Sequence, residues 1–427
     1  MNSRNRYLWA GIVTVGLGIV SSVTAFCGFY VGRVDAKLYN KASQIIIARD
    51  GERTTITMVS DYQGSLKDFA LVVPVPKVLK RAEIGINDST IIDKLDAYSA
   101  PRLVEYFDAD PCNPPQPMAV EDAAKPMTAQ APVMKSEAQR ANALGVTVEA
   151  QYSVGEYSIV ILSATQSDGL ETYLLQEGYK IPAGASKALA PYIKMNMKFF
   201  VAKINLAKAA SSGIVKLRPL RMSFKSSGFM LPLQLGMINA NGTQDLTVYS
   251  LTRKGRVETA NYQNVKVPSD KNIPDFVQPK FADFYGATFK KAYEREGKNA
   301  VFLEYAWTPN SCDPCASEPP DITQLRAAGA FWLAENPNDS VFFTRLHLRY
   351  DREHFKQDLM FKQTDNTENF QARYIMQHPF KGNTNCGQPG EQYRKDLAAR
   401  LETEAQTTAN LTGWDINSVR QQIKNFR

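Results

Sequence analysis

A proline-rich stretch at residues 111–145 limits the folds open to this chain more than any other sequence feature. Six prolines lie between positions 111 and 132, and no apolar periodicity survives among them. Because proline interrupts both helices and sheet ladders, we predict a flexible linker or long insertion here. It separates a β-rich N-terminal module with a helix (26–110) from a central α+β domain (146–275). A C-terminal α+β part (276–427) carries a C-x-x-C loop and a terminal helix.

The composition excludes several classes of protein. Hydrophobic residues make up 44% and charged residues 22% of the 427 positions, which argues against a mostly disordered chain and against a polytopic membrane protein. The formal net charge of +7 is small and spread along the chain, so no nucleic-acid partner is predicted. With three histidines and five cysteines, a His-rich metal cluster and a dense disulfide framework are excluded, and no cofactor is predicted.

The N-terminus has the pattern of an export signal. Arg4 and Arg6 precede an uncharged apolar stretch, and small residues follow, with Val23 and Ala25 placed for cleavage before Phe26. We therefore predict a signal peptide at 1–25 and a periplasmic or extracellular protein. The alternative is an uncleaved anchor in the inner membrane formed by residues 8–26.

Apolar and alternating runs predict an α+β fold with mostly antiparallel sheets and a few packed helices. Asp50-Gly51 lies between two β-prone runs and predicts a hairpin. Asp88 or Ser89 can cap a helix that runs toward Phe107 with an interruption at Pro101. The predicted strands cover residues 43–48, 54–59, 69–75, 157–162, 199–204, 214–224, 230–238, 245–251, 300–307 and 340–350. Two more helices are predicted at 167–178 and 391–408.

One spacing of apolar residues occurs twice. Each of the two segments predicts a strand, a short polar connection and a second strand. The shared spacing indicates repeated strand–turn–strand modules, although unrelated hairpins can align equally well. A hairpin turn is also predicted at 239–242, between the strands at 230–238 and 245–251. The two matching sets are Leu220, Met222, Phe224, Phe229 and Leu233, and Leu346, Leu348, Tyr350, Phe355 and Leu359.

The cysteines are candidates for disulfides. Cys312 and Cys315 form a C-x-x-C motif in a proline-rich loop, for which we favour a local structural disulfide over a redox couple or half of a metal site. A zinc site could combine this pair with His378 and Cys386, although the second half lacks a tight spacing. A bridge from Cys27 to Cys112 would tie down the N-terminus, and Cys386 would then be unpaired or bonded to Cys315.

Three cationic side chains share one face of a predicted strand. Arg345, His347 and Arg349 alternate with apolar residues, so they point to the same side and could bind an anion. His347 would be a titratable member of such a site. The alternative, which we favour, is a solvated strand face over an apolar core.

Several long stretches resemble a bacterial family catalogued as domain of unknown function 2330. They are "CGFYVGRVDAKLYNKASQIIIARDGERTTITMVSDYQGSLKDFALVVPVPKV", "LDAYSAPRLVEYFDADPC", "GYKIPAGASKALAPYI", "FLEYAW" with "CDPC", and "RLHLRYDREHFKQDLMF" with "QARYIMQHPF". The resemblance covers most of the chain after the export signal, apart from the proline-rich stretch and the C-terminal tail. It implies an exported bacterial protein and no particular activity, so no catalytic residue is transferred.

We therefore predict an envelope protein with a non-catalytic binding or structural role, whose partner is another envelope protein or a ligand. The apolar run at 72–76 could bind a partner by strand addition, although a buried strand that leaves the sheet is the more common structure for such a run. The alternative function is a thiol-disulfide or metal-binding protein centred on Cys312 and Cys315. Contact with a membrane is predicted only through an uncleaved N-terminal segment.

Overall fold

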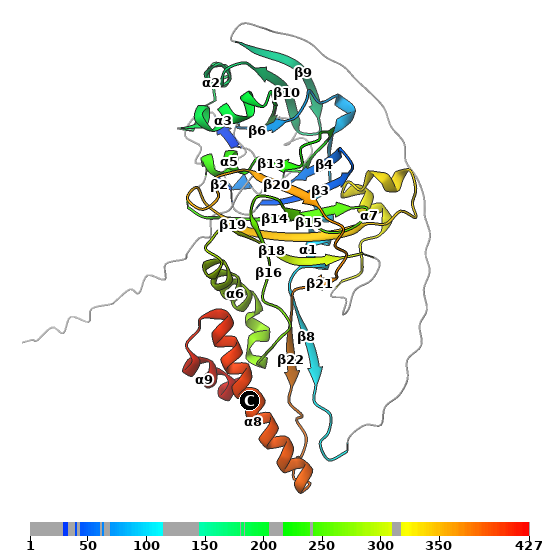
Figure 1. Ribbon diagram of the computed structural model, residues 1–427, viewed down its shortest axis with the longest axis vertical. Coiled ribbons are helices and arrows are strands. Elements are labelled where there is room, and N and C mark those ends of the chain that lie inside the picture. Colours follow the sequence, from blue (N-terminus) through cyan, green and yellow to red (C-terminus); the bar gives the residue numbers. More distant parts are fainter. Residues whose placement is uncertain are drawn as a thin grey trace, which may run out of the picture.

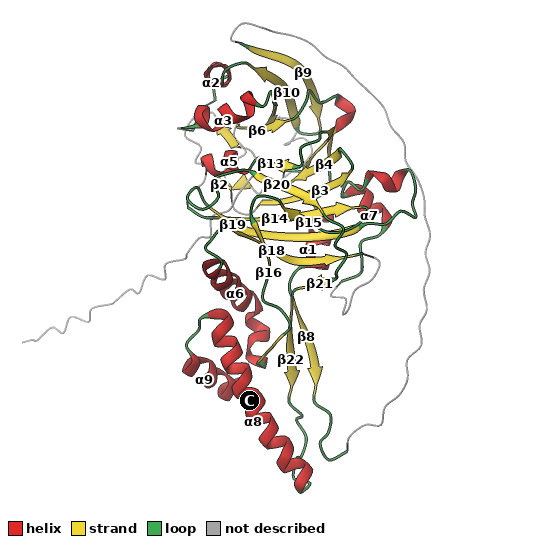
Figure 2. Ribbon diagram, in the orientation of Figure 1, coloured by secondary structure: helices red, strands yellow, loops and turns green. Residues whose placement is uncertain are grey.

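The structure is a computed structural model that describes residues 29–32, 39–40, 43–59, 62–63, 69–113, 145–179, 181–182, 184–204, 217–239, 242–309 and 317–426. The predicted signal peptide, most of the proline-rich stretch, and Cys27, Cys312 and Cys315 lie outside these residues. The predicted α+β class is confirmed, since helices cover several sheets with mostly antiparallel pairing (Figures 1 and 2).

A nine-stranded sheet forms the middle of the molecule (Figure 1). The predicted hairpin is at its centre, where β3 and β4 meet at Gly51, a residue with a positive φ of 56° that glycine adopts without strain. β3 runs parallel to β14, and most other neighbours are antiparallel. The strands are β3 Ser43–Asp50, β4 Arg53–Met58, β7 Ile84–Ile86, β12 Leu220–Lys225, β14 Gln244–Thr252, β16 Gln263–Lys266, β18 Ala300–Trp307, β19 Phe342–Tyr350 and β21 Phe370–Gln371.

A five-stranded antiparallel sheet packs against one face of the nine-stranded sheet. Inward residues such as Leu71 and Ile159 meet Ile45 and Met222 in the largest apolar core, because alternate residues of a strand share a face. β6 pairs with β11 at residues 70–75 and, within the described residues, with β1 only at 69–72. Residues 73–75 are thus paired on one side, and strand addition at 72–76 stays a prediction. The strands are β1 Phe29–Gly32, β6 Phe69–Val75, β9 Val146–Val154, β10 Tyr157–Ala164 and β11 Lys198–Ile204.

Helices cover the outer faces of both sheets. α2 (Ser167–Gln176) and α3 (Ala185–Lys194) bury Leu170 and Leu189 on the five-stranded sheet. On the far face of the nine-stranded sheet lie α1 (Thr90–Ser99), α7 (Ile322–Ala327) and the short η4 (Phe331–Ala334), which contribute to a core around Trp332. The layers therefore follow the order helix, sheet, sheet, helix.

The C-terminal helices form a lobe below the sheets (Figure 1). α6 (Phe281–Arg295), α8 (Gln388–Thr412) and α9 (Ile416–Phe426) pack around Phe284 and Tyr374, together with the short η3 (Asp275–Lys280). The lobe includes a parallel sheet of β17 Lys271–Ile273, β22 Arg373–His378 and β8 Arg102–Phe107. The smaller elements are β2 Tyr39–Asn40, β5 Tyr62–Gln63, η1 Arg81–Glu83, β13 Met230–Leu231, α5 Leu233–Gly236, η2 Met237–Asn239, β15 Val257–Thr259 and β20 Leu359–Gln363.

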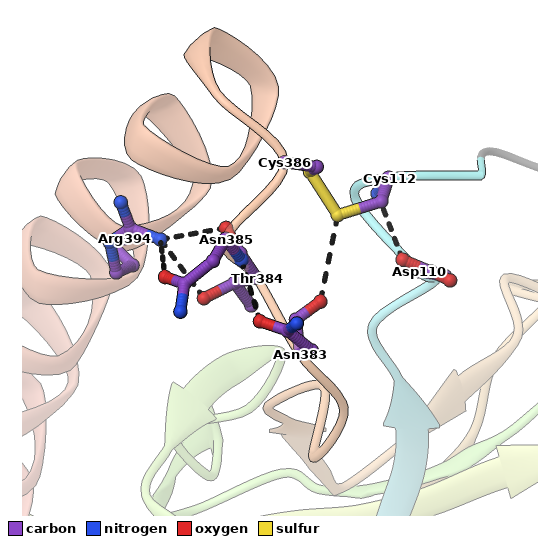
Figure 3. The surroundings of a disulfide bond; sticks show 7 residues. All are labelled: Asp110, Cys112, Asn383, Thr384, Asn385, Cys386 and Arg394. Carbon is purple, nitrogen blue, oxygen red and sulfur yellow. Dashed lines mark hydrogen bonds between the residues drawn. A yellow bond between two sulfur atoms is a disulfide. The ribbon is translucent and has the colours of Figure 1, made fainter.

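A disulfide joins Cys112 and Cys386, which follow β8 and β22 and are 274 residues apart in the chain (Figure 3). At the end of β8, the Asp108 carboxylate accepts hydrogen bonds from Arg400 at 2.7 and 2.9 Å and from the Tyr393 hydroxyl at 2.7 Å. Both residues belong to α8. The covalent bond and this hydrogen-bonded carboxylate thus fix the parallel strands to the C-terminal helix.

Two predicted elements are wrong. The helix from Asp88 ends at Ser99, and the residues after Pro101 form β8, which gains its ladder from β22. The strand predicted at 230–238 ends after Leu231, because Pro232 has no N–H to donate and the chain continues as α5 and η2. The hairpin predicted with residues 245–251 is therefore absent from the described residues, since β14 pairs with β3 and β19 instead.

The sequence segments are interleaved in space. The nine-stranded sheet takes β3 from the N-terminal segment, β12 from the central one and β18 from the C-terminal one, and the five-stranded sheet joins β6 to β11. The predicted division at residue 275 therefore does not separate independent modules. Among the described helices, none combines the length and the hydropathy needed to span a bilayer.

Candidate functional site

Arg345, His347 and Arg349 share one face of β19, which is buried at Arg345 and half-buried at His347 and Arg349. The side chain of Arg345 is 9% exposed. Its Nε donates to Glu304 Oε2 at 2.6 Å, and its Nη1 donates to Asp96 Oδ1 at 2.7 Å. Glu304, on the neighbouring β18, is fully buried. The interpretation of this face as solvated is therefore wrong.

His347 lies between two carboxylates. Its Nδ1 is 2.7 Å from Glu304 Oε1, and its Nε2 is 3.6 Å from Asp245 Oδ1. The Phe289 ring of α6 stacks on the imidazole at a centroid distance of 3.9 Å. Arg349 completes the row with a bidentate pair to Asp245, with both distances 2.8 Å.

The pKa values of these groups follow from competition between burial and opposite charge. Burial alone would lower the pKa of His347, but Glu304 and Asp245 outweigh it and raise the pKa from 6.5 to about 9. Burial likewise opposes ionisation of Glu304 and Asp245, yet the neighbouring cations hold the pKa of each at about 2. The whole row is therefore charged at neutral pH.

The cluster is balanced by its own anions. Three cations face three carboxylates, Asp96, Asp245 and Glu304, and α6 covers the centre of the row through Phe289. The role that the sequence predicts for an external anion is filled by carboxylates of the chain itself. This arrangement ties β14, β18, β19 and α1 together, so the cluster has a structural role.

The raised pKa of His347 predicts a loss of stability at alkaline pH. Its stabilising contribution is fully present below pH 6.5 and is lost as the pH rises through about 9. Because one pKa unit corresponds to about 1.4 kcal/mol, we expect the free energy of unfolding to fall by about 1–3 kcal/mol over this range. Urea unfolding followed by tryptophan fluorescence at a series of pH values measures this decline.

The His347→Gln variant should lose this alkaline decline, because glutamine does not titrate. His354→Gln is the matched control, since His354 belongs to a separate pair with Asp351 at 2.8 Å, and its variant should keep the decline. Equal pH profiles for the wild type and His347→Gln would contradict the assignment. The lowered pKa values of Glu304 and Asp245 have the opposite effect on the pH dependence. Their contribution to the free energy of unfolding is lost as the pH falls from about 4 toward 2.

The cysteine pairing differs from the expected one. Cys112 is bonded to Cys386, so the predicted bridge to Cys27 is wrong, as are an unpaired Cys386 and its bond to Cys315. The zinc site that uses Cys386 is also wrong, because a disulfide sulfur is not available as a thiolate ligand. The C-x-x-C motif lies outside the described residues, so its disulfide, redox and metal interpretations stay predictions.

The remaining histidines each contact a carboxylate. His354 contacts Asp351, and His378 Nε2 lies 2.7 Å from Glu105 Oε2. Within the described part of the chain, no group of three or more His, Cys, Asp or Glu side chains is arranged to hold a metal ion.

An apolar pocket of about 330 Å³ opens between the two large sheets. β4 and β12 contribute Met58 and Met222, which are 1% exposed and form its floor. Met195, after α3, is 51% exposed and stands at the mouth. The end of β6, the turn at 226–228 and β13 supply the other walls. Five methionines line this pocket: Met58, Met195, Met197, Met222 and Met230.

A buried arginine holds one wall of this pocket in place. The Arg49 guanidinium donates to the carbonyl oxygens of Ser226, Ser227 and Gly228 at 3.1–3.4 Å and lies 4.7 Å from the centre of the Phe229 ring. The turn between β12 and β13 is thereby fixed, although its residues are small and polar. The wall is preformed rather than dependent on a ligand.

The pocket offers a ligand apolar contact of adaptable shape. None of its described lining side chains is an acid, a base or a histidine. Methionine is unbranched and polarisable, so it adjusts to ligands of different outline. Sequence reasoning missed this site, because its residues come from four separate segments. The alternation of Met222 with Arg221 and Ser223 was visible, but nothing in the sequence brings Met195 and Met58 to it.

Comparison with known proteins gives one match. The family model described as "Uncharacterized protein conserved in bacteria (DUF2330)" matches residues 21–362. This range contains the five-stranded sheet, the nine-stranded sheet apart from β21, and all residues of the apolar pocket, whereas the resemblance noted at 371–380 lies beyond it. No curated protein and no solved structure matches the chain.

Proposed function

The chain belongs to the bacterial family DUF2330. We propose that it is an exported, non-catalytic envelope protein that binds an apolar ligand. The observation that carries the proposal is the methionine-lined pocket between the sheets. Ligand sites are typically concave, preformed and mostly apolar, and this pocket has all three properties. Its floor belongs to the main core, so the site rests on closely packed side chains.

Two features support export. The N-terminal residues have the charge and apolar pattern of a signal peptide. The disulfide between Cys112 and Cys386 forms and persists in an oxidising space such as the periplasm or the extracellular medium. The alternative function, a thiol or metal chemistry at Cys312 and Cys315, stays a prediction because no described residue bears on it.

Titration of the purified, oxidised protein with the neutral fluorescent probe N-phenyl-1-naphthylamine tests the apolar site. We expect saturable binding with one probe per chain. Met195→Asp, at the mouth, should weaken binding at least about tenfold, because a charge next to an apolar ligand must be desolvated. Its high exposure keeps the variant folded.

Leu175→Asp on α2 is the matched control, since Leu175 is equally exposed and lies outside the pocket. It should bind the probe like the wild type. Absence of binding, or equal affinities for Met195→Asp and the wild type, would refute the proposed site.

A further inference from the structure

A second cavity, of about 440 Å³, adjoins the apolar pocket on the opposite face of β4 and β12. Strand alternation produces this arrangement: Met222 faces the apolar pocket, while Arg221, Ser223 and Lys225 point to the other side. The end of α7, η1 and Gly329 complete its walls. Five basic side chains and one carboxylate line this basic cavity: Arg53, Lys77, Arg221, Lys225, Arg326 and Glu83.

Three of the five cations already have partners. Lys77 pairs with Glu83 at 2.5 Å, Arg326 donates to the Leu333 carbonyl, and Arg53 lies over the Phe331 ring at 4.1 Å. Arg221 and Lys225 differ from them, because no described residue forms a hydrogen bond or an ion pair with the side chain of either, although their backbones pair within the sheet. The basic cavity therefore carries uncompensated positive charge.

Arg221 is the more constrained of the two. Burial lowers its pKa, with no opposing acid, although an arginine remains protonated at neutral pH. The guanidinium rests on Gly85 of β7, where an added Cβ would stand 3.3 Å from Nη2. The Thr55 and Ser223 hydroxyls, 2.8 Å apart, lie in the same cavity and add hydrogen-bond donors. A partly desolvated cation beside two hydroxyls favours an anion.

The two cavities meet at the end of β12. Phe224 lines both cavities. Two residues that are adjacent in the chain, Pro76 and Lys77, line the apolar pocket and the basic cavity, respectively. Likewise, Ser226 lines the apolar pocket, and its neighbour Lys225 lines the basic cavity. β7 pairs only with residues 220–222 of β12, so the last three residues of β12 extend past it. One ligand can therefore reach both cavities around this end.

We propose that the ligand is a fatty-acid-like amphiphile, with its anionic head group at Arg221 and Lys225 and its apolar tail in the methionine-lined pocket. This inference rests on the proposed function, because it assumes that the apolar pocket is occupied. A peptide strand is the weaker candidate, since three residues of free edge provide few ladder hydrogen bonds.

Calorimetric titration with dodecanoate below its micelle concentration and with dodecan-1-ol below its solubility limit tests the head-group site. The two probes share a tail, so we expect dodecanoate to bind more tightly. Arg221→Gln should weaken dodecanoate binding about 10- to 100-fold and leave dodecan-1-ol unchanged, because it removes only a charge-assisted contact. Lys254→Gln, an exposed lysine outside both cavities, is the control and should change neither affinity.

The outcomes separate this inference from the proposed function. If neither probe binds, the apolar site itself is wrong. If both bind with equal affinity, or if Arg221→Gln leaves dodecanoate binding intact, the apolar site holds and the anionic head group is wrong. Thermal unfolding of Arg221→Gln checks that the variant is folded. Gly85→Ala gives a second test, since its methyl group displaces the guanidinium and should also weaken dodecanoate binding selectively.

Discussion

Replacing Glu304 with glutamine is expected to lower the free energy of unfolding by about 3–5 kcal/mol, the usual cost of removing one partner from a buried ion pair. Glu304 is fully buried and contacts Arg345 at 2.6 Å, His347 at 2.7 Å and the Tyr285 hydroxyl. Glutamine keeps the volume but not the charge. Two cations would then be left with weaker partners in a region that water does not reach. Urea unfolding measures the change.

The control for this variant is Asp365→Asn, which removes one partner of an exposed pair, Lys254–Asp365, at 3.8 Å. It should have no measurable effect, because exposed ion pairs contribute little. The double variant with His347→Gln should cost less than the sum of the two single changes, since both remove the same contact. A loss below about 1 kcal/mol for Glu304→Gln would show that the cluster is not a stabilising network.

Changing Cys112 and Cys386 together to serine is expected to cost about 2–5 kcal/mol. The bond closes a loop of 274 residues, and long loops lose the most entropy in the unfolded chain when they are cross-linked. The contacts of Asp108 with Arg400 and Tyr393 remain, so the C-terminal lobe should loosen rather than detach. Unfolding of the oxidised wild type and the variant under identical conditions measures the difference.

Reduction of the wild type supplies the control for this change. The reduced wild type should have the stability of the reduced serine variant. Reductant should destabilise the wild type by about 2–5 kcal/mol more than the variant, because a Cys312–Cys315 bridge would be lost from both. Peptide mapping of protein recovered from the bacterial envelope should recover Cys112 and Cys386 in one cross-linked species. Free thiols at both positions in that protein would contradict the bond and the oxidising compartment.

Local patterns in the sequence predict much of the fold correctly. Asp50-Gly51 predicts the central hairpin, and the spacing of Ile91, Leu95 and Tyr98 predicts the buried face of α1. Errors arise where a distant segment decides the structure. Residues 102–107 form a strand because β22 pairs with them. Residues 233–236 are helical, and the Gln234 N–H there donates to Asp358 at 2.9 Å.

The candidate site shows the same limit more strongly. The alternation of β12 predicts that Arg221 and Met222 face opposite sides, which is correct. Only the pairing of β12 with β4, and the contact of both with the five-stranded sheet, places Met58 and Thr55 in the two cavities. The alternating cations of β19 were visible in the sequence, but the carboxylates that neutralise them come from three other elements. Side-chain type and spacing therefore identify faces, and topology decides what covers them.

The position of the β3–β4 hairpin has a consequence for the order in which the molecule assembles. A chain emerges from the ribosome N-terminus first, so this hairpin is made well before either neighbour. The free edge of β4 is covered only when β12 has been synthesised, and the free edge of β3 only when β14 has been synthesised. Until then, both hydrogen-bonding edges of an apolar hairpin stay open. The chain therefore passes through an aggregation-prone stage, whether it folds during synthesis or after export, and we expect that stage to last until residue 252 is available to pair.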